Sequence, residues 1–144
     1  KAKLYDIYDI YVLSNKKYVR KQSLSKKRIK WETHLEWYTK KLVDENMFFY
    51  IAVDQNDCFL GQIRFLIENK EAIISISLDE KVMGKGIGKD ILYMGIQRFF
   101  SESKIRKITA YIQKSNVSSR KIFEHNGFSL VENNGKYNTY KYIS

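Results

Sequence analysis

Three closely spaced glycines carry the clearest chemical signal in this chain. They lie in the segment Met83-Gly84-Lys85-Gly86-Ile87-Gly88, after alternating apolar and small polar residues at 73–78 and before apolar residues at helical spacing. This pattern predicts a strand, a tight loop and a helix. Glycines let backbone N–H groups converge at a helix N-terminus, where unpaired amides and the positive end of the dipole bind an anion. The segment therefore predicts a phosphate-binding loop, and Lys85 and Lys89 add positive charge to it.

Two common phosphate-binding motifs do not fit this segment. A Walker loop needs Gly-Lys followed by Ser or Thr, and Gly88-Lys89 is followed by Asp90. A dinucleotide fingerprint needs a third glycine where Lys89 stands. The segment instead resembles the pyrophosphate loop of the GNAT superfamily of acetyl-CoA-dependent N-acetyltransferases, whose pattern is Q/R-x-x-G-x-G/A. Met83 replaces the usual Arg or Gln, which leaves the backbone cradle intact and removes one side-chain donor.

A second motif lies near the C-terminus. The segment 116–128, NVSSRKIFEHNGF, resembles the GNAT signature N-x-x-S/A-x-x-x-Y-x-x-x-G-F. A capped amphipathic helix that buries Ile122, Phe123 and Phe128 would explain this segment by itself. Paired with the glycine loop at this distance, the segment makes the resemblance to the superfamily much stronger, and that resemblance covers nearly the whole chain.

The resemblance implies acetyl-CoA as co-substrate and no metal. It places pantetheine in a gap between two splayed parallel strands, paired with exposed backbone of residues 76–78, and the pyrophosphate on residues 82–89. Asn116 would reach the pantetheine amide, and Ser119 and Lys121 would lie near the adenine and ribose phosphate. The cofactor-binding residues implied by the resemblance are Ile76, Ser77, Leu78, Val82, Met83, Gly84, Lys85, Gly86, Ile87, Gly88, Lys89, Asn116, Ser119, Lys121 and Phe123.

Aminolysis of a thioester requires a neutral amine, stabilisation of negative charge on the carbonyl oxygen, and departure of a thiolate. A backbone N–H near Leu78, freed by the splay, could donate to that oxygen. The proton of the amine could leave through a water held by a side chain, and the sequence does not choose among several candidate bases. These candidates are Glu71, Ser75, Ser77 and His34.

Phe123 is the second departure from the family pattern. Most relatives carry there a Tyr thought to protonate the thiolate, and a phenyl ring has no proton to give. A thiol with a pKa near that of Cys, about 8.5, leaves tolerably as its anion. We therefore expect loss of the acid to slow the reaction and not to abolish it. The tyrosines that could substitute are Tyr93, Tyr111, Tyr137 and Tyr140.

Three further segments, 15–23, 34–38 and 61–64, resemble a branch that acetylates the amino group of nucleotide-linked amino sugars, as in pseudaminic acid type pathways. Arginines could pair with a diphosphate, and aromatic rings could stack on uracil or sugar. The alternative is that the arginines are surface residues, the aromatic residues are core, and the histidine packs on Trp37. The expected substrate-binding residues are Asn15, Arg20, His34, Trp37, Tyr38, Gln62 and Arg64.

Two other functions remain open at this point. A protein N-terminal or lysine acetyltransferase of the ribosomal-protein type shares part of the pattern, but a peptide substrate would favour an acidic cleft and this chain is basic. A non-catalytic module that binds acyl-CoA or nucleic acid would explain Met83 and Phe123.

Hydrophobic periodicity and turn residues predict an α+β fold of the GNAT type, with a mixed, mostly antiparallel sheet and central splayed parallel strands. The first strand of the family would lie before or at residues 1–4. Ser25 is predicted to cap the second helix, and Asn133-Asn134-Gly135 to form a hairpin turn. The expected helices are 6–15, 25–46, about 87–103 and 116–126, and the expected strands are 47–54, 58–68, 71–78, 105–112, 129–132 and 136–142.

Composition sets the remaining expectations. A chain of 144 residues with 44% hydrophobic residues predicts one folded domain, and no apolar run approaches the ~20 residues that would span a bilayer. A lone cysteine, Cys58, cannot form an internal disulfide, which favours a reducing cytoplasm. The net charge of +10 suits a polyanionic small molecule, while no nucleic-acid motif is present. We expect a monomer or homodimer, and the start at Lys1 favours one domain of a longer polypeptide.

Overall fold

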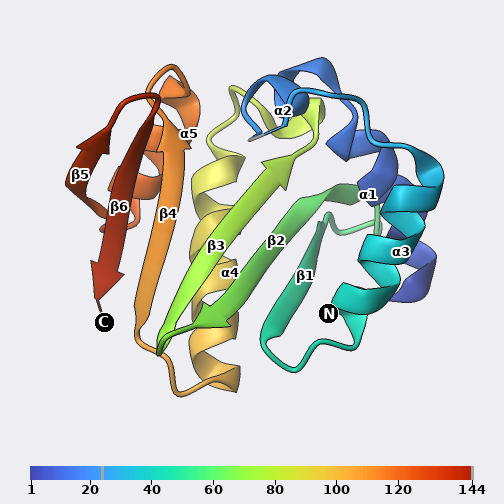
Figure 1. Ribbon diagram of the computed structural model, residues 1–144, viewed down its shortest axis with the longest axis horizontal. Coiled ribbons are helices and arrows are strands. Elements are labelled where there is room, and N and C mark those ends of the chain that lie inside the picture. The colour runs from blue at the N-terminus through green and yellow to red at the C-terminus, as the bar shows by residue number, and fades with distance from the viewer. Residues whose placement is uncertain (24, 144) are drawn as a thin grey trace.

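The computed structural model describes residues 1–23 and 25–143, which form one six-stranded sheet flanked by helices (Figure 1). The strand order is β1-β2-β3-β4-β6-β5, and every neighbouring pair is antiparallel except β3 and β4. The α+β fold expected from the sequence is confirmed. The strands are β1 Met47–Val53, β2 Phe59–Glu68, β3 Glu71–Leu78, β4 Lys107–Gln113, β5 Ser129–Asn134 and β6 Tyr137–Ile143.

Helices cover the two faces of the sheet unequally. The long helix α4 crosses behind β2 and β3, and α5 lies behind β4 and β6 (Figure 1). On the front, α1 packs on β2 and β3, and α3 packs on β1. The helices are η1 Leu4–Asp6, α1 Ile7–Ser14, α2 Lys17–Lys21, α3 Trp31–Leu42, η2 Glu80–Val82, α4 Ile87–Glu102 and α5 Val117–His125. Within the described residues, no helix is both long enough and apolar enough to span a bilayer.

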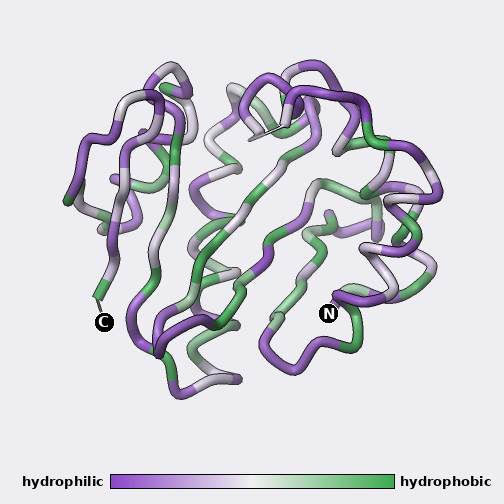
Figure 2. The backbone as a smooth tube through the Cα atoms, viewed as in Figure 1, coloured by the Kyte–Doolittle hydropathy of each residue, from purple (hydrophilic) through white to green (hydrophobic). Residues whose placement is uncertain are grey.

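The main hydrophobic core lies between the back of the sheet and α4. Phe65 and Phe99 stack in parallel with their ring centroids 4.3 Å apart, and both are fully buried with Leu92 and Ile108. The green hydrophobic stretches of Figure 2 run along β1 to β4 and α4. This core packs β2 and β3 against α4. Because successive side chains of a strand point to opposite faces of the sheet, the polar residues that alternate with these core residues face the front.

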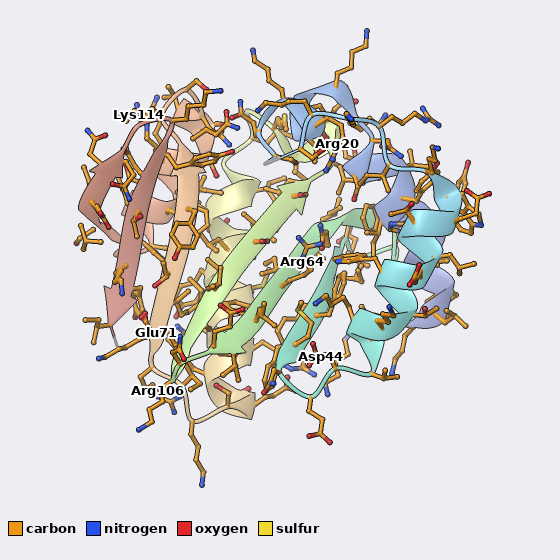
Figure 3. The ribbon with its side chains drawn as sticks, in the orientation of Figure 1. Arg20, Asp44, Arg64, Glu71, Arg106 and Lys114 are labelled. Carbon is orange, nitrogen blue, oxygen red and sulfur yellow. The ribbon has the colours of Figure 1, made fainter. Side chains whose placement is uncertain are left out.

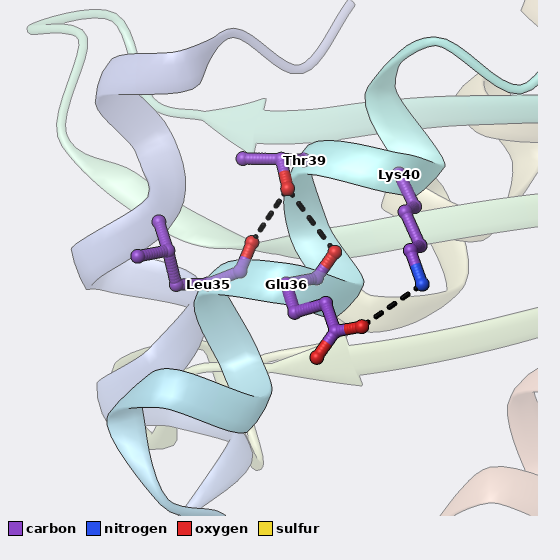
Figure 4. Close-up of polar contacts among 4 residues, drawn as sticks. All are labelled: Leu35, Glu36, Thr39 and Lys40. Atoms are coloured by element: carbon purple, nitrogen blue, oxygen red, sulfur yellow. Dashed lines mark hydrogen bonds and ion pairs between the residues drawn. The ribbon is translucent and has the colours of Figure 1, made fainter.

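A smaller core holds the N-terminal helices on the front of β1, with Ile10, Tyr38 and Phe49 at its centre. The outer side of α3 is polar: Thr39 Oγ1 donates hydrogen bonds to the carbonyl oxygens of Leu35 and Glu36, and Lys40 pairs with Glu36 at 2.9 Å (Figure 4). Since these contacts are solvent-exposed, they contribute little to stability, and α3 is held mainly by its buried side.

Two local predictions were wrong. Ser25 does not cap a helix, because Lys30 is extended and α3 begins only at Trp31, after the separate short helix α2. The hairpin turn lies at residues 135–136, since β5 continues through Asn134. The first strand of the family is not formed at residues 1–4, where the Ala2 N–H donates one hydrogen bond to Phe49 O before the chain enters η1, and a position before Lys1 stays a prediction.

The β3–β4 pair opens soon after it forms. Its only paired positions are Ala72 with Ile108 and Ile73 with Thr109. From there to Leu78, five residues or about 16 Å of strand, β3 has no ladder partner on that side. Figure 1 shows the two strands diverging toward the end of β3 where the glycine loop begins. The splay expected from the resemblance is therefore present.

Candidate active site

The glycine loop presents an open backbone cradle at the N-terminus of α4. Gly84 and Gly86 both have φ of +72°, a left-handed conformation that glycine adopts without steric cost. A Cβ added at either glycine would meet no protein atom within 4 Å. The first N–H groups of α4, from Ile87 onward, have no intrahelical partner by helix geometry. The loop thus combines free donors, the positive end of a helix dipole and unfilled space, which fits a pyrophosphate.

Val82 and Met83, which precede the loop, anchor it, and their backbone N–H groups are not free to bind a ligand. Val82 is buried, and its N–H donates to Asp79 O, while the N–H of Met83 donates to Glu80 O. The Met83 side chain is 49% exposed. The candidate pyrophosphate donors therefore narrow from 82–89 to 84–89.

Backbone groups of β3 face the opened gap. Asp79 N–H donates to Leu60 O at 2.7 Å, which makes Gly61 and Leu78 a non-hydrogen-bonded pair of the antiparallel ladder. In such a pair the N–H and C=O of each residue point away from the partner strand. The groups of Leu78, and by alternation those of Ile76, therefore point toward the gap beside β4. Leu78 O accepts there from the Tyr18 hydroxyl at 2.7 Å, whereas the Leu78 N–H and the backbone groups of Ile76 are positioned to pair with an extended ligand such as pantetheine.

The start of α5 offers side chains on the other side of the gap. Asn116 caps the helix, because its Oδ1 accepts from the Ser119 N–H at 3.2 Å, and its amide nitrogen makes no hydrogen bond within residues 1–23 and 25–143. That nitrogen can still donate to a ligand carbonyl. Ser119 is half-buried and Lys121 is exposed. Arg120, which sequence reasoning missed, has a buried Nε without a partner among the described residues.

Phe123 is buried, with 2% of its surface exposed, and packs edge-on against Phe128 at 4.9 Å between ring centroids.

The four tyrosines proposed as a substitute acid do not lie together. Tyr93 lines a groove of about 520 Å³ between α4 and α5, Tyr140 donates to Glu124 Oε1 at 3.3 Å, Tyr137 accepts from Gln113, and Tyr111 is exposed on β4. The tyrosine that does lie at the head of the splay is Tyr18, which sequence reasoning did not single out.

Glu71 does not fit the role of a base. It lies at the opposite end of β3 from Leu78, seven residues or about 23 Å away, and Figure 3 shows it at the end of the sheet far from Arg20. Both of its oxygens accept from Lys141 Nζ, at 2.9 and 3.0 Å. This hydrogen bond lowers the pKa of Glu71, so the carboxylate is a weaker base still.

His34 does not fit that role either, and its alternative reading as a packed helix residue matches the structure. Its side chain is 2% exposed, stacks on Tyr38, and its Nε2 donates to Ile7 O at 2.9 Å. Burial lowers the pKa of His34. Ser75 and Ser77 are half-buried on the front of β3, and Ser77 lies next to Leu78, so these two remain candidates to hold a water.

Arg64 is the most unusual charged residue of the front face. Register places it opposite Phe49 and Ser75, and its guanidinium carbon lies 4.7 Å from the centre of the Trp37 ring. It is half-buried and has no hydrogen bond or ion pair within residues 1–23 and 25–143. Burial and the charge of Arg20 lower the pKa of Arg64 to about 10. A guanidinium that lies over the Trp37 ring with no anion partner among the described residues can bind an anion.

Gln62 is a second polar group without a partner on this face. It lies two residues along β2 from Arg64, on the side of the glycine loop, and opposite Ile51 and Ser77. Its side chain is 2% exposed, yet its Oε1 has no hydrogen-bond partner among the described residues. A buried amide oxygen of this kind is costly unless a donor arrives from a ligand or a water.

Arg20 and Tyr38 are held in ways that the sequence did not predict. Arg20 donates to the carbonyl oxygens of Ser14, Ser25 and Lys27, so its guanidinium organises the loop after α2. Tyr38 is fully buried and donates to Lys3 O at 2.6 Å, which rules out stacking on a substrate ring. The loop after α2 and α2 itself form a shallow pocket of about 440 Å³. The pocket is lined by Asn15, Lys17, Arg20, Lys21, Lys26 and Arg28.

These features define a class of protein. A mixed sheet that splays at its parallel pair, with a glycine loop at the head of the splay, is the acyl-CoA N-acyltransferase fold. The Acetyltransferase (GNAT) domain family matches residues 1–129, and the chain belongs to that family.

Three similar proteins illustrate the range within this fold. The chain is 32% identical over 107 residues to "Putative phosphinothricin acetyltransferase YwnH" of Bacillus subtilis, which covers 68% of this chain and 62% of that protein. It is 29% identical over 112 residues to the acetyltransferase PseH of Campylobacter jejuni, covering 77% and 69%. A Vibrio cholerae spermidine N-acetyltransferase, solved with CoA and spermine, superposes with a TM-score of 0.85 over 97% of this chain and 89% of that one. At 16% identity this last likeness shows the fold alone.

Phe123 yields a first test of the chemistry. Phe123→Leu is expected to lower the free energy of unfolding by about 1 to 2 kcal/mol through lost packing. Any fall in kcat should be in proportion to the losses of stability and of acetyl-CoA affinity. Phe128→Leu is the matched control, because it removes the other ring of the same pair. The kcat of the wild type is expected to show no decline at high pH from a titrating tyrosine. A decline abolished by one of the mutants Tyr93→Phe, Tyr111→Phe, Tyr137→Phe or Tyr140→Phe would instead identify a relocated acid.

Proposed function

We propose that this chain is an acetyl-CoA-dependent N-acetyltransferase whose acceptor is a primary amine carrying an anionic group, of the nucleotide-linked amino sugar class. The observation that carries the acceptor proposal is Arg64, a half-buried cation with no anion partner among residues 1–23 and 25–143. Membership of the acetyltransferase family and the open backbone cradle of the glycine loop support acetyl-CoA as the acyl donor.

The residues that would hold acetyl-CoA are those that surround the splay. The loop from Gly84 to Lys89 would bind the pyrophosphate, the backbone of Ile76 would pair with pantetheine, and Asn116 would donate to a pantetheine carbonyl. Acetyl-CoA supplies a thioester carbonyl that an amine can attack. The chain supplies the Leu78 N–H, which points into the gap where negative charge develops on that oxygen.

The front face supplies the features that an anionic acceptor needs. Arg64 and Gln62 lie on β2 beside β3, so they stand one strand away from the splay. The basic pocket around α2 adds cations, and burial together with the charge of Arg20, which lines that pocket, lowers the pKa of Arg64. A diphosphate that spans Arg64 and this pocket would relieve the mutual repulsion of the arginines. Remote binding energy of this kind can be used to lower the barrier at the amine.

The same charges disfavour two other acceptors. Spermidine is a polycation and would be repelled by Arg64 and by the arginine and lysine side chains of the basic pocket. A peptide amine would meet the same basic side chains, and the net charge of +10 does not favour the acidic cleft that such a substrate prefers. A short anionic amino acid such as phosphinothricin is the second candidate, because its acidic groups could also pair with Arg64. The Bacillus relative favours it.

The test is acetylation of a panel of amines, followed by thiol release. We expect kcat/KM for a UDP- or CMP-linked amino sugar to exceed that for the same free sugar by on the order of 10²-fold, the contribution of charge-assisted hydrogen bonds to a diphosphate. Equal values for the two forms, or activity confined to peptides, would refute the acceptor proposal. A preference for phosphinothricin over both sugars would select the second candidate.

A further inference from the structure

Tyr18 reaches the head of the splay from a distant part of the chain. Its hydroxyl donates to Leu78 O at 2.7 Å, a contact across 60 positions of sequence. The short helix α2 that carries it is tied to the same end of the sheet by an ion pair between Lys16 and Glu80 at 3.3 Å. Figure 1 shows α2 beside the tip of β3, where the glycine loop starts.

The direction of the Leu78 carbonyl determines where the phenol oxygen lies. Gly61 and Leu78 form a non-hydrogen-bonded pair, so both backbone groups of Leu78 point away from β2 and toward the gap. Tyr18 Oη is therefore at the edge of the gap, on the same side as the Leu78 N–H. An oxygen that accepted from that N–H would lie within about two hydrogen-bond lengths, roughly 6 Å, of the phenol.

The acidity of the phenol decides what it can do there. Burial, reinforced by the charges of Asp79 and Glu80, raises the pKa of Tyr18 to about 12. A thiol has a pKa of about 8.5, so transfer of the Tyr18 proton to a departing thiolate would be uphill by more than three pH units. Tyr18 therefore suits a different task, that of an O–H donor that stays neutral throughout the working pH range.

We propose that Tyr18 is a second hydrogen-bond donor to the acetyl oxygen, alongside the Leu78 N–H. The proposal rests on the acetyltransferase function proposed above. As the amine lone pair forms the new C–N bond, the π electrons of the carbonyl move onto oxygen, and the Tyr18 hydroxyl turns from Leu78 O to that oxygen. When these electrons re-form the carbonyl, the C–S bond breaks and CoA leaves as its thiolate. The amine loses its proton to water, and Tyr18 keeps its own.

The first test is Tyr18→Phe, which removes one oxygen atom and keeps the ring. We expect kcat to fall on the order of 10²-fold, as for loss of one oxyanion donor, with KM for acetyl-CoA changed less than about threefold. Tyr8→Phe on the exposed side of α1 is the matched control and should leave both constants unchanged. If Tyr18 only holds α2 against β3, Tyr18→Phe will raise KM and leave kcat unchanged. Lys16→Met, which breaks the ion pair with Glu80 that also connects α2 to this end of the sheet, should then have the same effect. That result would overturn the proposal.

The second test does not depend on turnover. Tyrosines labelled with ¹³C at Cζ report hydrogen bonding and protonation of each phenol by NMR. We expect the Tyr18 signal to move when a ketone analogue of acetyl-CoA binds, in which a methylene replaces the sulfur, and to move much less with CoA, which lacks the carbonyl. Equal shifts with both ligands would overturn the role of Tyr18 and leave the acetyltransferase function standing. Failure of both ligands to bind the folded chain would overturn the function as well.

Discussion

Arg64→Met is expected to lower kcat/KM for a nucleotide-linked amine by about 10²-fold or more and to lower the value for the free amine far less. The guanidinium is half-buried against Trp37 and has no anion partner among the described residues, so a phosphate bound there would gain charge-assisted hydrogen bonds. Methionine keeps much of the apolar stem and removes the charge. Steady-state kinetics on the two acceptors would measure the difference.

Arg106→Met is the matched control for this substitution. Arg106 also stacks its guanidinium on an aromatic ring, that of Phe100 at 5.2 Å, but it lies with Glu71 at the end of the sheet far from Arg20 (Figure 3). Its replacement changes net charge and aromatic stacking in the same way and should leave both acceptors unaffected. Arg64→Lys should recover only part of the activity, because an ammonium cannot make the paired hydrogen bonds of a guanidinium. If Arg64→Met and Arg106→Met behave alike, Arg64 does not bind the acceptor.

Arg64 is also expected to be held at some cost to stability. Burial and Arg20 lower its pKa, which means that the folded state disfavours the charged form relative to the unfolded chain. The contact with Trp37 offsets part of this cost. Thermal unfolding of Arg64→Met should therefore show a Tm equal to or above that of the wild type. A binding residue that destabilises its own fold is typical of functional sites, whereas a structural arginine would lower Tm when removed.

Much of the fold could be predicted because its signals are local. The alternation in 71–78, the glycines at 84–88 and the helical spacing that follows are each set by neighbouring residues, and the structure has these elements with bounds within one or two residues. The region between α1 and α3 could not be predicted, because the contacts that order it are distant or irregular. Arg20 binds carbonyl oxygens of the loop, which no periodicity reports.

The site residues divide in the same way. The glycine cradle and the Asn116 cap depend on backbone geometry that the sequence pattern encodes directly. Glu71 and His34 were plausible bases by residue type, but whether a base is free depends on its tertiary partners, here Lys141 and the Ile7 carbonyl. Tyr18 could not be found from the sequence, since its role follows from contact with a carbonyl 60 residues away.

Gly86→Asp is expected to weaken acetyl-CoA binding at least tenfold, about 1.4 kcal/mol. Gly86 is the N-cap of α4, and a side chain there enters the open space in front of the loop. An aspartate there places a negative charge beside the first helical N–H groups, where the pyrophosphate would bind. It should therefore compete with the ligand while the helix itself stays intact. Isothermal calorimetry with acetyl-CoA would give the affinity.

Two variants separate the charge from the backbone effect. Gly86→Asn has nearly the same shape without the charge and tolerates the left-handed conformation, so it should weaken binding by only a few-fold. Gly135→Asp introduces the same residue at another glycine of positive φ, +58°, in the β5–β6 turn, where a Cβ also meets no atom within 4 Å. It should lower stability by an amount similar to that of Gly86→Asp and leave acetyl-CoA affinity unchanged. If Gly86→Asp binds acetyl-CoA as tightly as Gly135→Asp does, the pyrophosphate does not lie on this loop, and the acyl donor must be sought elsewhere on the sheet.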